Sequence, residues 1–475
     1  MEHSALPGER REAQARVQAA LRAWYVVEDD SATRLDDWLL VQERLARLDE
    51  PASPALFRRL TNEVLIAGLD ELARIDAQAT TILRQRYLDL RLGKEVAKGL
   101  KLSLDQVNRL QATALRQLSD ILVGQEEALR ETRAQALIAA LPPAPYQALI
   151  GMDDQVDRAV RLLQGSDASP VVVLAGLGGL GKTALADAVA RRLAHMARIA
   201  GLIWLRAPGA SLSDPKPYDF DAVVHDLYAA LFPDEAMASM TAVRLNRVRQ
   251  VLQRQTYLVA IDNLENPEDL RNLVEHLPGL ALPTRFLLTA RTRPSTGAAA
   301  HTLALGELSE ADAVELALDH FRRTQPDEES ALVADDAAAI FAVVGGNPLA
   351  LKLAVGLIAV QPLDDLLRDL RERQTPTIDD LYRHIYWRIW NALSPQAQAL
   401  LLGMPLIAET GAAPEQLAAI SGLADAELWP AIQELWGRSL LEVRGTVRAK
   451  RYGIHRLTET FVQTDLTHWS DRFPE

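Results

Sequence analysis

The sequence predicts an α/β core with a parallel sheet and flanking helices, joined to mostly helical segments on both sides. The first observation is a β-branched strand, a glycine-rich loop and an amphipathic helix that follow one another in residues 169–194. The second is a pair of further apolar strands, 257–261 and 284–292, that run into polar residues. The third is the composition of residues 1–140, which are rich in Ala, Leu, Arg and Glu and favour helix. Strands that alternate with helices indicate a parallel sheet.

Composition excludes several classes of protein. The chain has 475 residues, 48% hydrophobic and 24% charged, and we expect it to fold into roughly two to four domains. It has no cysteine, which excludes disulfides, thiolate catalysis and cysteine–zinc sites. No apolar run reaches the length of a membrane span and the N-terminus lacks a signal-peptide core, so we expect a cytoplasmic protein. The net charge of −13 restricts any contact with nucleic acid to a local basic patch.

The glycine-rich loop has the pattern of a phosphate-binding loop, or P-loop, G-x-x-x-x-G-K-[ST]. Its backbone N–H groups can turn inward around phosphate oxygens, and the helix that follows adds a favourable dipole. We expect Lys182 to reach the β- and γ-phosphates of ATP, and the Thr183 hydroxyl to ligate Mg²⁺. The predicted site for ATP or ADP comprises Gly176, Gly178, Gly179, Gly181, Lys182, Thr183 and Ala184.

A P-loop of this kind needs an acidic residue at the end of a neighbouring strand, where it holds Mg²⁺ through water. Asp262 follows the apolar strand 257–261 and fits this role. Many hydrolytic proteins have a second acid next, which orients the attacking water, but here the residue is Asn263. An amide cannot take a proton, so we expect slow hydrolysis. Glu265 is nearby, and we interpret it as a solvated loop residue.

Arg291 lies at the end of the third strand, in "TRFLLTART". An arginine at this position can contact a γ-phosphate and thereby report its presence, whereas an ordinary surface arginine is the alternative. Taken with the two preceding strands, the pattern predicts that Lys182, Asp262 and Arg291 act on the nucleotide, with Mg²⁺ held by Thr183 and Asp262.

With these motifs in this order, the chain resembles the STAND ATPases with an NB-ARC core, which include plant immune receptors, apoptosome proteins and bacterial regulators. The resemblance covers roughly residues 145–465. It implies that Ile150, in "LIGMDD", packs on the adenine and that residues 201–207 form the second strand. It also implies that Pro348, in "GGNPLALK", stacks near the adenine. Met152 stands where the family usually has an arginine.

The last 100 residues resemble the winged helix of the same family. Helical patterns begin at residues 394 and 425, and a hairpin follows in "SLLEVRGTVRAKRYGIHRL". The resemblance implies that His455 touches the β-phosphate of bound ADP, whereas Arg456 departs from the aspartate that the family often has next. A nucleotide held from three sides implies an ADP-bound, monomeric resting state and an ATP-bound, oligomeric active state.

Residues 76–122 contain the pattern of a helix-turn-helix. A short helix in "LGKEVAKGL" precedes a longer one, and Ser103 with Gln106 forms a capping box at the start of the second. The segment resembles the promoter-reading C-terminal domain of sigma factors. Residues 81–122 carry eight basic and four acidic side chains, a net charge of +4. We predict contacts with double-stranded DNA through Ser103, Gln106, Asn108 and Arg109, and a helical adaptor for another protein is the alternative.

These patterns predict a helical N-terminal region (1–75), the helix-turn-helix (76–125), a linker (126–147), a nucleotide-binding domain (148–300), a helical subdomain (301–375) and the winged helix (376–475). The sequence shows no repeat with a period of roughly 20 to 50 residues, so the sensor is a separate protein or nucleic acid, or the chain is a truncated form of a longer protein. Three functions remain open. They are a nucleotide-switched signalling ATPase in transcriptional regulation or anti-phage defence, a DNA-handling ATPase motor, and a scaffold with a structural nucleotide.

Overall fold

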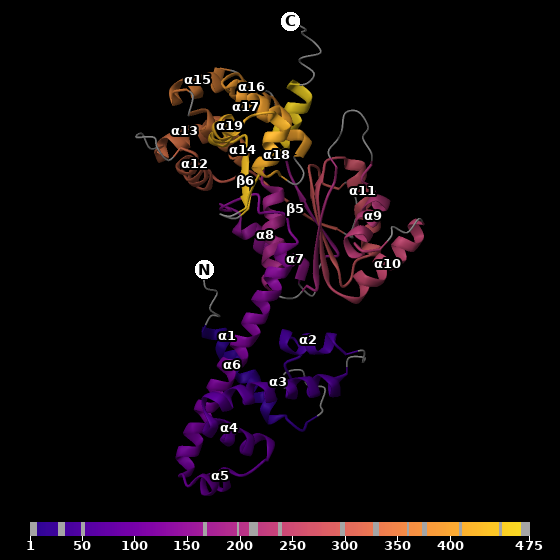
Figure 1. The fold of residues 1–475 in the computed structure, drawn as a ribbon, viewed down its shortest axis with the longest axis vertical. Coiled ribbons are helices and arrows are strands. Elements are labelled where there is room, and N and C mark those ends of the chain that lie inside the picture. Colours follow the sequence, from indigo (N-terminus) through magenta and orange to yellow (C-terminus); the bar gives the residue numbers. More distant parts are fainter. Residues whose placement is uncertain are drawn as a thin grey trace. The chain divides into compact units, whose positions relative to one another are not determined.

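The computed structural model divides the chain into two compact units, which we describe separately (Figure 1). The first contains residues 1–136 with 195–197, and the second contains residues 137–194 with 198–475. Within the described residues, no helix combines the length and the apolar character needed to cross a membrane. The described residues are 7–26, 34–48, 53–164, 169–196, 199–208, 217–235, 240–294, 300–325, 332–358, 361–372, 378–407, 411–445 and 449–466.

The N-terminal unit is helical (Figure 1). Its elements are α1 (Pro7–Arg22), α2 (Leu39–Ala46), α3 (Pro54–Ile75), α4 (Ala77–Leu83), the π-helical turn η2 (Arg84–Leu88), α5 (Gly93–Leu100) and α6 (Leu104–Ala139). Its core includes Leu65 and Leu69 of α3 and Leu118 and Leu122 of α6, all fully buried. Gly68 allows the two helices to approach, because a Cβ atom there would lie 2.7 Å from Leu122 Cδ2.

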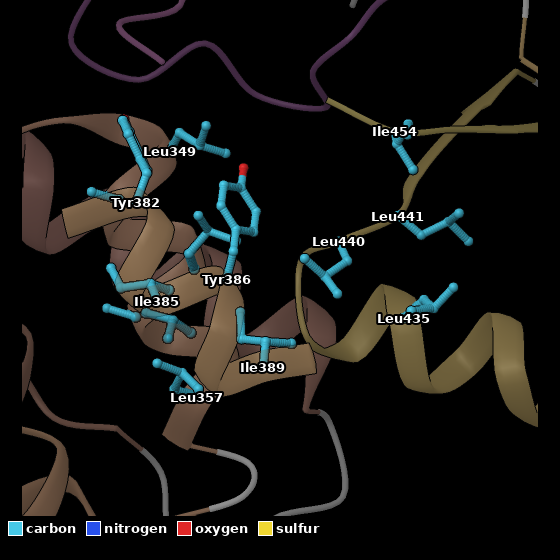
Figure 2. Close-up of a cluster of buried hydrophobic side chains, with 14 of the residues drawn as sticks. Leu349, Leu357, Tyr382, Ile385, Tyr386, Ile389, Leu435, Leu440, Leu441 and Ile454 are labelled. Carbon is cyan, nitrogen blue, oxygen red and sulfur yellow. The ribbon is translucent and has the colours of Figure 1, made fainter. Parts of the chain in front are cut away.

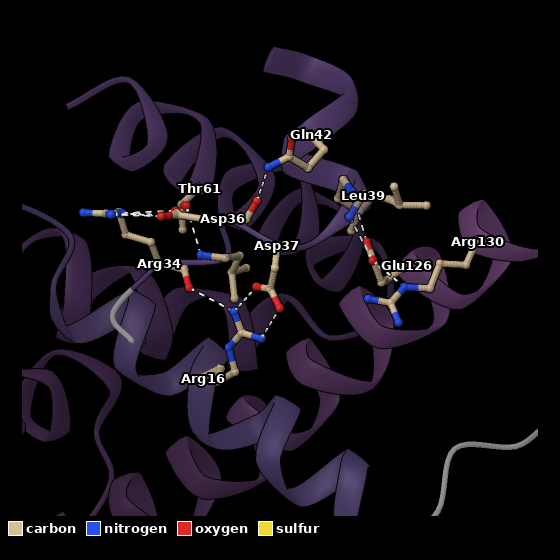
Figure 3. Close-up of polar contacts among 11 residues, drawn as sticks. Arg16, Arg34, Asp36, Asp37, Leu39, Gln42, Thr61, Glu126 and Arg130 are labelled. Atoms are coloured by element: carbon tan, nitrogen blue, oxygen red, sulfur yellow. Dashed lines mark hydrogen bonds and ion pairs between the residues drawn. The ribbon is translucent and has the colours of Figure 1, made fainter. Parts of the chain in front are cut away.

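A buried carboxylate ties α2 to α6 (Figure 3). The first N–H groups of a helix need partners, and α2 has no capping side chain of its own. The Glu126 carboxylate takes this role by accepting hydrogen bonds from Leu39 N (2.9 Å) and Leu40 N (3.0 Å). Arg130 Nε donates to Glu126 Oε1 at 2.7 Å and balances its charge. Glu126 therefore caps α2 from a distant part of the chain.

Both helices of the predicted helix-turn-helix are present as α5 and the start of α6. The capping box is confirmed, since Ser103 Oγ accepts from Gln106 N at 3.2 Å and Gln106 Oε1 accepts from Ser103 N at 2.8 Å. The predicted linker is shorter than expected, because α6 continues through Glu126 and ends only at Ala139. The helix continues there because buried residues such as Glu126 recur along it.

The second unit contains a five-stranded parallel sheet with the order β2-β3-β4-β1-β5. The strands alternate their side chains between two cores, so that α7 and α8 cover one face and α9, α10 and α11 cover the other. The strands are β1 (Val171–Ala175), β2 (Gly201–Arg206), β3 (Tyr257–Leu264), β4 (Arg285–Ala290) and β5 (Ala300–Ala304). The helices are α7 (Asp153–Gln164), α8 (Lys182–His195), α9 (Phe220–Leu231), α10 (Thr241–Arg254) and α11 (Pro267–His276).

The predicted helical subdomain and winged helix share one hydrophobic core (Figure 2). Leu349 and Tyr386 belong to the same buried cluster as Leu435 and Leu441. The helices are α12 (Glu310–Thr324), α13 (Ala334–Val344), α14 (Pro348–Ile358), α15 (Leu363–Glu372), α16 (Ile378–Asn391), α17 (Pro395–Gly403), α18 (Pro414–Ser421), α19 (Asp425–Gly437) and α20 (Arg456–Phe461). The predicted hairpin consists of β6 (Glu442–Gly445) and β7 (Lys450–Gly453), which pair antiparallel.

Candidate nucleotide-binding site

The strand order brings the predicted nucleotide-site residues to one edge of the sheet. β4 lies between β1 and β3, so the carboxyl ends of these three parallel strands open at the same edge. The P-loop follows β1, Asp262 lies near the end of β3, and Arg291 directly follows β4. In open parallel sheets, ligands bind at this carboxyl edge.

The P-loop between β1 and α8 is closed on itself by Lys182. Its Nζ atom donates hydrogen bonds to Gly176 O at 2.8 Å and to Leu177 O at 2.7 Å. Burial lowers the pKa of Lys182 to about 8, and the positive charge of Arg291 adds to the effect. Two cations held this close favour an anionic ligand, because added negative charge supports the protonated form of Lys182.

Asp262 is buried and accepts hydrogen bonds from two threonines. Thr183 Oγ1 donates to Asp262 Oδ1 at 2.9 Å, and Thr289 Oγ1 donates to the same oxygen at 2.6 Å. Mg²⁺ prefers oxygen ligands and is usually held by one or two carboxylates together with substrate phosphates. Thr183 and Asp262 fit such a site. In the described part of the chain, no group of three or more His, Asp or Glu residues could hold a metal ion without the nucleotide.

Asn263 is held by the strands on either side of it. Its φ angle is 78°, and the pairing of β3 with β4 shifts register between Ile261 and Leu264. Asparagine tolerates this left-handed backbone conformation better than most residues. The Asn263 side-chain amide donates to Ala207 O at 3.0 Å, after the end of β2. One N–H group of the amide is therefore bonded to the backbone, and an amide cannot take a proton from a reacting water molecule.

Arg291 lies beside the P-loop. Its side chain is 39% exposed, and its Nε atom is 3.9 Å from Glu265 Oε1. An ion pair of this length and exposure contributes little stability, so the guanidinium can change partner at small cost. A Cβ atom on Gly178 would lie 3.4 Å from Arg291 Nη2. Arg291 is thus placed close to the backbone that would hold the phosphates.

Asn347, in the helical subdomain, and Tyr382, in α16, cover the P-loop from the other side. Asn347 Nδ2 donates to Gly178 O at 3.0 Å, and the Tyr382 hydroxyl donates to the same oxygen at 3.5 Å. Gly179 has a φ angle of 79°, and a Cβ atom there would lie 2.7 Å from Asn347 Oδ1 and 2.9 Å from Leu349 Cβ. The P-loop and the start of α14 therefore pack without room for a side chain at this position.

A cavity of about 290 Å³ lies between these two walls. This volume is close to the lower end, about 300 Å³, of the range of small-molecule sites in proteins. Gly176 and Asp262 adjoin it through their hydrogen bonds to Lys182 and Thr183. The predicted residues that line it are Ile150, Gly178, Gly179, Gly181, Lys182, Thr183, Ala184, Arg291, Pro348 and His455. The fold thus brings together residues that are about 300 positions apart in the sequence.

His455 stands at the N-terminus of α20 and caps this helix. Its Nδ1 atom accepts a hydrogen bond from Leu457 N at 3.1 Å. A neutral imidazole that accepts at Nδ1 carries its proton on Nε2, where it can donate to a ligand. The Leu457 side chain reaches the P-loop, since a Cβ atom on Gly178 would lie 3.2 Å from Leu457 Cδ1. The side chain of Arg456 lies outside the described residues.

Three polar residues that no sequence pattern indicated also line the cavity. They lie on α12, on α14 and after α19. His320 Nε2 lies 2.6 Å from Ser439 Oγ, which donates to Lys352 O at 2.9 Å. Because the single hydroxyl proton of Ser439 is used in that bond, His320 Nε2 is the donor. Burial lowers the pKa of His320 to about 3, and the charges of Lys352 and Arg323 add to the effect.

Three further residues of the site escaped the sequence analysis. Thr289 precedes Arg291 by two positions, and Asn347 directly precedes Pro348, so both stand inside motifs that we had quoted. The signal for Thr289 was a polar side chain directly after an apolar run, and the signal for Asn347 was a polar side chain directly before a proline. Tyr382 lies in α16, in a segment where no pattern pointed to the P-loop.

The predicted DNA-contact residues lie in the N-terminal unit. Ser103 and Gln106 are bound to each other's backbone in the capping box, and Arg109 Nε donates to Asp105 O at 3.4 Å. Ser103, Gln106, Asn108 and Arg109 are all exposed. The exposed basic residues of α5, the turn and α6 are Lys94, Lys98, Lys101, Arg109 and Arg116. The sigma-factor resemblance itself stays a prediction.

Comparison with known proteins bears on the second unit. The NB-ARC domain family matches residues 152–317. The regulatory protein AfsR of Streptomyces coelicolor is 28% identical over 264 residues, which are 52% of this chain and 25% of AfsR. AfsR of Streptomyces griseus is 29% identical over 195 residues, which are 40% of this chain and 18% of that protein. The chain therefore spans a quarter or less of the length of these relatives.

Among solved structures, a STAND protein with a tetratricopeptide repeat sensor from Pyrococcus horikoshii is similar over 69% of this chain and 44% of its own. The sequence identity is 17% and the TM-score is 0.43. The NB-ARC match begins just before α7 and ends within α12, so it contains the whole sheet with its polar carboxyl edge. Residues 152–317 therefore form an NB-ARC domain, which is a nucleotide-binding domain with the P-loop fold described above.

Proposed function

We propose that the protein is a nucleotide-operated switch, with ADP bound at rest and ATP bound in the active state. The observation that carries this proposal is that the P-loop, Pro348 of the helical subdomain and His455 after the hairpin all line the same cavity. A ligand held by all three parts stabilises their closed arrangement. A ligand that needs more room at its phosphate end favours an open arrangement.

The proposal gives each group in the cavity a role. Lys182 binds the β- and γ-phosphates, and Thr183 with Asp262 holds Mg²⁺, which neutralises phosphate charge. Arg291 contacts the γ-phosphate of ATP. The adenine lies between Ile150 and Pro348. His455 donates to the β-phosphate of ADP.

Hydrolysis is slow in this proposal. The residue after Asp262 is an amide, which cannot accept a proton, and one of its N–H groups is bonded to Ala207 O. Arg291 is available to read the γ-phosphate because its ion pair with Glu265 is long and exposed. Slow turnover suits a switch, since the ATP-bound state must last long enough to act.

The output of the switch is assigned to the basic face of α5 and α6, which we propose binds double-stranded DNA. In this proposal the exposed lysines and arginines supply phosphate contacts, and the exposed side chains of Asn108 and Arg109 contact base edges. AfsR is named a regulatory protein, which favours transcriptional regulation, and anti-phage defence is the other setting we propose. The proposal also includes a cytoplasmic location and the formation of homo-oligomers when ATP is bound. A separate sensor or effector protein is the expected protein partner.

The test is to identify the nucleotide that the freshly purified protein carries, by denaturing it and separating the released nucleotides by ion exchange. We expect near-stoichiometric ADP. His455→Ala should then lose ADP and assemble with ATP in size-exclusion chromatography, and Arg291→Ala should bind ATP without assembling. An empty site in the wild type, or variants that behave like it, would contradict the switch and favour a motor or a scaffold.

A further inference from the structure

Thr289 occupies the end of β4, next to Asp262. Its hydroxyl donates to Asp262 Oδ1 at 2.6 Å and accepts from Asn263 N at 2.8 Å. The residue is only 2% exposed. One buried hydroxyl therefore satisfies two groups of the neighbouring strand, the carboxylate and the backbone N–H that follows it.

The register shift in β3 makes this arrangement possible. The left-handed conformation of Asn263 displaces the backbone, and its N–H group meets the Thr289 hydroxyl while its side-chain amide bonds to Ala207 O. The ends of β2, β3 and β4 are thus joined around Asp262. A β-bulge that re-aims a side chain is common next to functional sites.

Thr183 donates to the same carboxylate oxygen, Asp262 Oδ1, at 2.9 Å. In the proposed function the Thr183 hydroxyl turns to Mg²⁺ when nucleotide binds, so Thr289 is then the threonine that still holds Oδ1. We infer that Thr289 is the positioning residue of the magnesium site, which fixes the rotation of the Asp262 carboxylate toward the metal. The inference rests on the proposed nucleotide site and concerns how its metal ligand is oriented.

The orientation of the Asp262 carboxylate matters because nearby cations also attract it. The charge of Asp262 acts on Lys182, and Arg291 lies in the same surroundings. Without the hydrogen bond from Thr289, the Asp262 carboxylate would rotate toward these cations. Mg²⁺ would then bind more weakly, because part of the binding free energy is used to turn the carboxylate back. Without the hydroxyl, the partly buried Asn263 N–H would also lose its partner.

The experiment compares nucleotide affinity in Mg²⁺ and in EDTA, measured by calorimetry with ADP and with ATP on the full chain. Thr289→Val keeps the shape and removes the hydroxyl, and it should lose at least about fivefold of the Mg²⁺-dependent gain in affinity while its affinity in EDTA stays unchanged. Thr289→Ser keeps the hydroxyl and should restore the gain. If Thr289→Val does not fold, Thr289→Ala gives the same comparison.

Thr284→Val is the matched control. Thr284 is fully buried at the start of β4, where its hydroxyl donates to Leu252 O at 2.7 Å and accepts from Tyr257 N at 3.1 Å. The Thr284→Val variant should lower the midpoint of thermal unfolding as Thr289→Val does, but it should keep the full Mg²⁺-dependent gain in nucleotide affinity. A Thr289→Val protein with the full gain would overturn the inference. A wild-type protein without any Mg²⁺-dependent gain would instead overturn the proposed site.

Discussion

The nucleotide cavity and the basic face of α6 use polar side chains in opposite ways. In the cavity, Asp262 and Thr289 are buried and joined by a hydrogen bond of 2.6 Å that links two strands. On α6, Arg109 and Arg116 are exposed, and each bonds to a neighbour in its own helix. The first region is set by geometry before a ligand arrives, and the second offers charge on a helical surface.

This difference predicts how each region responds to change. A substitution in the cavity should act on affinity through groups held in fixed positions, and with little dependence on salt because buried charges are weakly screened. A substitution on α6 should act through charge, and its effect should weaken as salt rises. Four measurements test this contrast.

The largest effect is expected from Lys182→Ala. The variant removes the cation that closes the P-loop, and ADP affinity should fall by at least about 100-fold, or about 2.7 kcal/mol. Arg192→Ala is the control, because this arginine lies on the same helix with a side chain that is 56% exposed and should leave affinity unchanged. Calorimetry that gave equal affinity for Lys182→Ala and the wild type would rule out the P-loop assignment.

Gly179→Ala should break the contact between the P-loop and the helical subdomain. The new Cβ atom would meet Asn347 Oδ1 at 2.7 Å in a left-handed backbone conformation, so we expect a loss of about 2 kcal/mol in nucleotide binding. Gly306→Ala is the control, because nothing lies within 4 Å of its Cβ position. Equal affinities for the two variants would mean that the helical wall does not shape the site.

Acid should weaken the closed arrangement through His320. Its pKa of about 3 in the fold lies below the ordinary value near 6.5, so the unfolded chain takes up a proton that the folded chain does not. Stability should fall as the pH drops below 6.5, by up to about 1.4 kcal/mol per pH unit. His320→Gln cannot titrate, so the difference between the two urea midpoints should change between pH 7 and 5.5. A constant difference would refute the role of His320.

The smallest effect is expected from Arg109→Ala. DNA affinity should fall by about 1 kcal/mol, with a shallower dependence on salt, because one phosphate contact is lost. Arg74→Ala removes an equal charge from α3, where the side chain is 75% exposed, and should leave gel shifts unchanged. Identical gel shifts for the wild type, Arg109→Ala and Arg74→Ala would favour a protein-binding adaptor over a DNA-binding domain.

The sheet side of the cavity could be predicted because local sequence determines it. A P-loop, a strand that ends in Asp262 and a strand that ends at Arg291 each carry their chemistry in a few consecutive residues. The parallel sheet then brings these ends together without further information. The NB-ARC match confirms the predicted nucleotide-binding domain, and the roles of the individual residues stay predictions.

The other wall could not be predicted from local pattern. Tyr382 reaches Gly178 O only because α16 packs on α14 in the shared core, and nothing in its own segment indicates a ligand. The same holds for Glu126, whose role depends on the uncapped start of α2. Contacts of this kind follow from tertiary packing, which a reading of neighbouring residues does not contain.

The core that joins the helical subdomain to the winged helix has a consequence for timing. Any movement that separates the two parts must expose residues such as Tyr386 and Leu435 to water, at about 25 cal/mol for each Å² of apolar surface. That barrier slows spontaneous opening whichever nucleotide is bound. In the proposed switch, activation without a signal would then be rare, because its rate is limited by how fast the two halves of this core separate.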